Sequence, residues 1–148
     1  MSDAIQWLAV GPEATDSQDP GLRSAVASAI ERELADRTPK SDVLADSDRR
    51  SVILATTPRG GVAVKRHHER SSTRLRDSLR RPLLGSAARR EWRALNSAWN
   101  TLQHAEGAPR MPRPIALLGA GGQEWMLTEF VPGTPLLDAL RSAPLEER

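Results

Sequence analysis

The feature that most constrains this chain is a short turn between two apolar segments. Residues 58–61, Pro-Arg-Gly-Gly, combine the amino acids that favour tight turns. The segments on either side, 51–56 and 62–66, are rich in β-branched and other apolar residues. Two such segments joined by a short turn predict an antiparallel hairpin.

The second strand of this hairpin carries a lysine. Successive side chains of a strand point to opposite faces, so Val62 and Val64 share one face, while Ala63 and Lys65 share the other. Taken alone, a lysine at this position is typical of a half-buried strand whose long side chain reaches solvent.

Glu91 lies on the apolar face of an expected helix. We expect this helix over about 86–104, with Ser86 as its cap. The stripe consists of Ala88, Trp92, Leu95, Trp99 and Leu102. A buried carboxylate without a charged partner is costly, and the only lysines are Lys40 and Lys65, although many arginines could also pair with it. We therefore expect Glu91 to face Lys65 across the helix and the strand.

Other segments predict further helices and strands. Asp19-Pro20 is typical of a helix start, because aspartate caps the first turn and proline suits the first helical position. The remaining expected elements are a strand or docked arm within 1–18, the end of the first helix at 38–39, a weak strand at 42–45, a short basic helix with a loop over 67–85, a hairpin of 115–118 and 124–130 around the turn 119–122, and a last helix over 136–140.

Composition limits the classes of protein to which this chain can belong. Its 148 residues suffice for one core, and the absence of cysteine excludes disulfides and thiolate metal sites. We expect neither a signal peptide nor a membrane helix, because no apolar segment has the required length. The cytoplasm is the expected location, and the inner face of the membrane is the alternative.

Positive charge is concentrated in one part of the chain. Between Arg66 and Arg93 there are nine arginines against three acidic residues. This density predicts contact with an anionic surface, and the alternative is a solvated face. We expect no nucleic-acid partner. His67-His68 lacks the spacing of a metal site, so no metal ligand is predicted.

Four segments, taken in order, resemble a known family. They are Val62-Ala63-Val64-Lys65, the helix segment 89–95 with Glu91, the proline-rich connector 109–114 with Ile115-Ala116-Leu117, and 127–133. Together they are similar to the N-terminal lobe of the lipopolysaccharide kinase family, the Kdo and core-heptose kinases. The resemblance covers roughly 42–142. It implies an α+β, protein-kinase-like lobe: an antiparallel sheet of about five strands with one helix packed on it, here with an extra N-terminal helix.

The resemblance also implies roles for individual residues. Lys65 would bind the α- and β-phosphates of ATP, with Glu91 as its helix partner. The backbone of Glu129, Phe130 and Val131 would be the hinge that binds adenine, and Val52, Ala63 and Met126 would lie near the adenine ring.

Two features depart from the family pattern. The turn 46–50, which would cover the phosphates, contains no glycine. The His-x-Asp catalytic motif and the later metal-binding aspartate have no match, so no catalytic residue is assigned. We therefore expect this chain alone to be inactive, as a partial product or with a second chain that supplies the other lobe. Mg²⁺ is expected only with that missing C-terminal lobe.

The sequence therefore predicts the ATP-binding lobe of a lipopolysaccharide-type sugar kinase. The expected organisation is an N-terminal extension (1–41), the lobe (42–131), and a hinge with the start of a further lobe (132–148). Partners would be ATP and, through Arg66–Arg93, lipopolysaccharide or an anionic membrane surface. The alternatives are an aminoglycoside-type or other small-molecule phosphotransferase, and a non-catalytic kinase-like module that binds an anionic surface or a partner protein.

Overall fold

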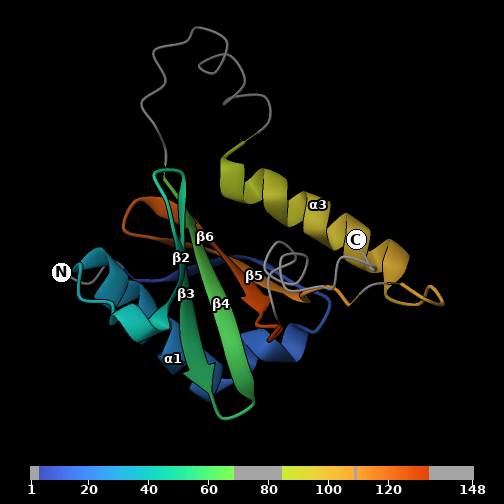
Figure 1. Ribbon diagram of the computed structural model, residues 1–148, viewed down its shortest axis with the longest axis horizontal. Coiled ribbons are helices and arrows are strands. Elements are labelled where there is room, and N and C mark those ends of the chain that lie inside the picture. The colour runs from blue at the N-terminus through green and yellow to red at the C-terminus, as the bar shows by residue number, and fades with distance from the viewer. Residues whose placement is uncertain (1–3, 69–84, 109, 134–148) are drawn as a thin grey trace, which may run out of the picture.

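The computed structural model describes residues 4–68, 85–108 and 110–133. These residues form an α+β fold in which an open antiparallel sheet of six strands is flanked by two helices (Figure 1). The elements, in chain order, are β1 (Gln6–Val10), η1 (Ala14–Gln18), α1 (Pro20–Leu34), η2 (Lys40–Asp42), β2 (Val43–Asp46), β3 (Arg50–Thr57), β4 (Gly60–His67), α3 (Ala87–Leu102), β5 (Pro114–Ala120) and β6 (Gln123–Glu129).

The sheet has the strand order β1-β5-β6-β4-β3-β2, and every neighbouring pair is antiparallel. We expected about five strands, and the additional one is β1, which pairs with β5 at one edge. The strand alternative for residues 1–18 is therefore confirmed. The weak strand expected at 42–45 is also present, as β2 at the opposite edge.

Both predicted hairpins are present. In the first, β3 and β4 pair along their whole length around Pro58 and Arg59. In the second, β5 is longer than expected, β6 begins and ends one residue earlier than expected, and only Gly121 and Gly122 form the turn. These glycines have φ angles of 58° and 69°, which suits the two-residue hairpin turn with two positive φ angles that side chains disfavour.

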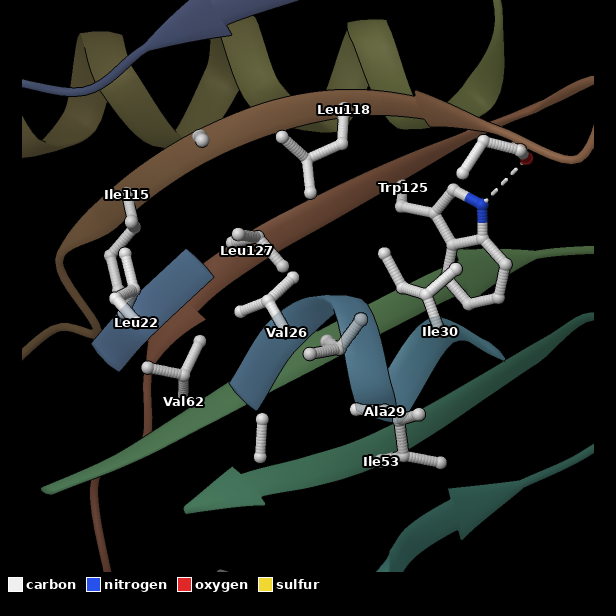
Figure 2. Close-up of a cluster of buried hydrophobic side chains, with 14 residues drawn as sticks. Leu22, Val26, Ala29, Ile30, Ile53, Val62, Ile115, Leu118, Trp125 and Leu127 are labelled. Carbon is white, nitrogen blue, oxygen red and sulfur yellow. Dashed lines mark hydrogen bonds between the residues drawn. The ribbon is translucent and has the colours of Figure 1, made fainter. Parts of the chain in front are cut away.

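The helix α1 covers one face of the sheet. Its start is as predicted, because the Asp19 carboxylate accepts hydrogen bonds from the backbone N–H groups of Gly21 and Leu22 at 2.9 and 3.3 Å. Figure 2 shows the buried cluster that α1 forms with the sheet. Its buried members are Leu22, Val26, Ala29, Ile30, Ile53, Ala55, Val62, Val64, Ile115, Ala116, Leu118, Ala120, Trp125 and Leu127. The helix of the expected N-terminal extension therefore shares a core with the sheet.

The helix α3 packs on the other face, chiefly against β5 and β6. Ser86 caps it as predicted, since its hydroxyl accepts a hydrogen bond from the Arg89 N–H at 3.1 Å. Ala88 and Trp92 are buried against Leu117 and Met126. The expectation of a continuous buried stripe is wrong at its far end, because Leu102 is 37% exposed.

Two expected elements lie outside the described residues. They are the body of the basic helix and loop between 69 and 84, and the final helix over 136–140. Within the described residues, no helix has the length and apolar character needed to cross a membrane.

Candidate functional site

Lys65 and Glu91 are in direct contact between β4 and α3. The Lys65 Nζ forms an ion pair with the Glu91 Oε1, and the two side chains are 18% and 33% exposed. The alternation along β4 turns Lys65 toward α3 while Val64 is buried on the α1 side. The helical period turns Glu91 toward the sheet next to Trp92. The two residues therefore face each other as the sequence predicts.

Glu91 has a second basic neighbour that the sequence analysis did not assign. The His67 Nε2 lies 2.7 Å from the Glu91 Oε2, although its N–H is not aligned with that oxygen as a hydrogen bond requires. Since His67 follows Lys65 by two positions on the same strand, the period of two places both on one face. That period was the signal that could have identified His67.

These contacts change the electrostatics of Glu91. The contact with His67 lowers the pKa of Glu91, burial acts in the opposite direction, and the hydrogen bond and charge of Lys65 lower the pKa further. The net result is a pKa of about 2 against the ordinary 4.5. Because the His67 N–H is poorly aligned, we regard the Lys65 ammonium as the firmer partner. Glu91 is thus ionised at any pH near neutrality.

This lowered pKa predicts how Glu91 stabilises the fold as pH changes. A carboxylate with a lowered folded-state pKa contributes stability above its unfolded pKa, and that contribution is lost as pH falls from 4.5 to about 2. The full shift would correspond to about 3 kcal/mol, but a third of the side chain is exposed, so screening leaves on the order of 1 kcal/mol. Urea unfolding of the protein and of Glu91→Gln should differ by this amount at about pH 6 and converge near pH 2. A constant difference would contradict the assignment.

An apolar strip of the sheet lies beside the ion pair. On the face that carries Lys65, the register aligns Val52, Lys65, Met126 and Leu117 across four strands. The next row consists of Leu54, Ala63 and Thr128. The helix α3 covers the part of this face on β5 and β6, so Met126 is only 1% exposed. Val52, Leu54 and Ala63 are half-buried.

The structure thus separates the residues that the resemblance places near adenine. Val52 and Ala63 lie on the less covered strip next to Lys65, whereas Met126 is buried under α3 with Trp92. The Met126 side chain is therefore covered by α3 and is not open to a ligand in this arrangement.

The segment 129–131, the expected hinge, begins at Glu129, the last residue of β6. The N–H of Glu129 donates to the Arg113 carbonyl at 2.9 Å, and the N–H of Phe130 donates to the Gly61 carbonyl at 3.0 Å. A Cβ at position 61 would lie 2.9 Å from the Leu54 side chain and 3.1 Å from that of Phe130, so both side chains pack closely against Gly61. Two of the backbone donors expected to bind adenine are therefore already used within the fold.

The turn between β2 and β3 is closed by hydrogen bonds of Ser47, one of its own residues. The Ser47 N–H donates to the Arg50 carbonyl at 2.9 Å, and the Ser47 hydroxyl accepts from the N–H groups of Arg49 and Arg50. The turn is therefore ordered without glycine, and its backbone is engaged internally.

Comparisons with known proteins do not add an assignment. No protein-family model, no curated protein and no solved structure matches the chain. Among the residues described here, no group of three or more histidine, aspartate or glutamate side chains is placed to hold a metal ion. The candidate site accordingly rests on Lys65, Glu91, His67 and the strip beside them.

Proposed function

We propose that this chain is the ATP-binding lobe of a lipopolysaccharide-type sugar kinase, which transfers a phosphoryl group from ATP to a sugar hydroxyl in the complete protein. The observation that carries the proposal is the ion pair between Lys65 and Glu91. In protein kinases, a strand lysine binds the nucleotide phosphates and is held by a glutamate of the following helix. A lysine is a point charge suited to phosphate, and a carboxylate partner fixes its position.

The order of elements supports the same function. Among the five strands β2 to β6, Lys65 lies on the third, and the helix that carries Glu91 follows directly after that strand in the order of described elements. Kinases likewise carry this lysine on their third strand and the glutamate on the next helix. The family resemblance of the sequence and the contact between the two side chains therefore lead to the same proposal.

The surroundings of Lys65 fit an adenine nucleotide. An incompletely covered apolar strip, formed by Val52, Leu54 and Ala63, lies next to a basic side chain. This suits a nucleotide, whose adenine ring is linked through ribose to phosphates. Because the N–H groups of Glu129 and Phe130 are already bonded, contacts to adenine would come from other backbone groups of 129–131. Lys65 would hold the phosphates and Glu91 would orient Lys65.

A nucleotide titration followed by NMR tests this proposal. We expect ATP at millimolar concentration to shift the amide signals of Val52, Ala63, Lys65 and residues 129–131. Adenosine, which has no phosphates, should perturb the strip and leave the signals around Lys65 and Glu91 nearly unchanged. Inorganic triphosphate, which lacks the adenine ring, should shift the signals around Lys65 and Glu91 and leave those of the strip nearly unchanged. Equal shifts from ATP and triphosphate, spread over exposed arginines, would contradict a nucleotide site.

One observation favours a second candidate, a non-catalytic kinase-like module. The turn 46–50 has no glycine and is closed by Ser47, so the backbone N–H groups of Ser47, Arg49 and Arg50 are already bonded, whereas a glycine-rich turn uses its N–H groups to cover phosphates. Absence of ATP binding in the titration would favour this candidate. An aminoglycoside-type acceptor in place of a lipid-linked sugar also remains a proposal, as does the anionic surface for Arg66–Arg93, most of which lies outside the described residues.

A further inference from the structure

We propose that His67 is a positioning residue of this site: its protonated ring holds the second oxygen of Glu91, and the added positive charge favours phosphate at Lys65. The part that concerns phosphate rests on the function proposed above. The part that concerns Glu91 does not, because it follows from a contact within the protein.

The geometry divides the Glu91 carboxylate between two basic groups of the same strand. One oxygen contacts the Lys65 Nζ, and the other lies 2.7 Å from the His67 Nε2. A carboxylate with a positive charge beside each oxygen can rotate less than one with a positive charge beside a single oxygen. Glu91, and through it Lys65, is therefore better fixed in position when His67 is charged.

The charge of the group depends on whether the His67 ring carries a proton. Glu91 is ionised near neutral pH because its pKa is about 2. Imidazole is the side chain whose charge ordinarily changes between about pH 5 and pH 8. With a neutral ring the group carries one positive and one negative charge, and protonation leaves a net positive charge beside the expected phosphate position.

Among the described residues, other charged groups near His67 come from three packed elements. Arg50 is the register partner of His67 on the neighbouring strand β3. Glu124 of β6 lines the same hollow of about 260 Å³ as His67. Arg89 of α3 holds the Glu124 carboxylate at 2.8 and 3.0 Å, which offsets its charge. Within the described part of the chain, Glu91 is thus the carboxylate in direct contact with His67, and the ring lies at the edge of the hollow.

The first arm of the test is a double-mutant cycle without nucleotide. It uses His67→Gln, Glu91→Gln and the double variant, with urea unfolding at about pH 5.5 and about pH 8.5. Glutamine keeps a neutral N–H donor near the position of Nε2, so the fold should be retained. We expect the two sites to be coupled by about threefold in the unfolding equilibrium constant at the lower pH, and by much less at the higher pH. Coupling that is absent, or equal at both pH values, would overturn the proposal.

The second arm measures ATP affinity of the protein, His67→Gln and the matched control His68→Gln at the same two pH values. The nucleotide also titrates in this range, so the decisive quantity is the ratio between variant and protein at each pH. We expect His67→Gln to weaken binding about threefold at the lower pH and hardly at the higher one, and His68→Gln to have no effect at either. A pH-independent ratio would overturn the role in phosphate binding. If the unchanged protein binds no ATP while the first arm shows coupling, the proposed function fails and the pairing of His67 with Glu91 stands.

Discussion

Replacing Lys65 by methionine is expected to lower the affinity of this protein for ATP by at least about tenfold, the loss typical of removing a charged hydrogen-bond donor from a phosphate. Methionine keeps the length and the apolar stem of lysine, so the packing along β4 should change little. The variant therefore removes the ammonium and its contact with Glu91 and leaves the hairpin in place. Fluorescence competition with a labelled ATP analogue would measure the affinity.

Three further variants make this measurement specific. Lys40→Met removes the only other lysine, which lies in η2, and should leave the affinity unchanged. Lys65→Arg retains the charge with a different shape and should lose less affinity than Lys65→Met. Glu91→Gln keeps Lys65 but removes its partner, so a smaller loss is expected. If Lys65→Met and Lys40→Met bind ATP equally well, Lys65 is not the phosphate ligand.

The hairpins could be predicted from sequence because their determinants are local. The turn at 58–61 and the glycines before β6 are short-range signals. The period of two along β4 correctly predicted that Val64 and Lys65 lie on opposite faces of the sheet. The expected second turn was too long, since Gly119 and Ala120 continue β5. Within β5, Gly119 pairs with Glu124, and the side chain of Leu8 from β1 lies beside it.

The sixth strand could not be placed from sequence. Nothing local to Gln6–Val10 specifies β5 as its partner, because β5 lies far along the chain and the two meet only in the folded sheet. The irregularity between Trp7 and Ala9 further weakens any alternating pattern. Edge pairing of this kind depends on tertiary contacts, and local propensity does not encode it.

The extent of burial along α3 could not be predicted for a related reason. Periodicity shows which side of a helix faces inward, but not where the opposing surface ends. Trp92 packs on Met126, whereas Leu102, on the same stripe, is exposed. The same holds for the site. The periods of strand and helix correctly predicted that Lys65 and Glu91 face each other, but they could not predict that α3 covers Met126, because this depends on where the helix lies on the sheet.

The largest effect on stability is expected at Trp125. Its side chain is fully buried between α1 and the sheet, and its Nε1 donates to the Ala120 carbonyl at 3.0 Å, drawn as a dashed line in Figure 2. Truncation to alanine would leave a large cavity and cost about 3–5 kcal/mol. Since the free energy of unfolding of a domain is about 5–15 kcal/mol, Trp125→Ala should be largely unfolded or melt at a much lower temperature.

A pair of phenylalanine variants separates the hydrogen bond from the packing. Trp125→Phe keeps an aromatic ring but leaves the Ala120 carbonyl without this donor, so we expect a loss of about 1–3 kcal/mol. Trp99→Phe is the matched control, because the Trp99 Nε1 is buried and has no hydrogen-bond partner among the described residues. Removing an unpaired donor should cost nothing or stabilise the fold slightly, since the desolvation penalty of that N–H disappears. Urea unfolding followed by circular dichroism measures both variants without relying on tryptophan fluorescence. If Trp99→Phe proved as destabilising as Trp125→Phe, the hydrogen bond to Ala120 would not account for the loss at position 125, and that loss would have to come from the change in packing.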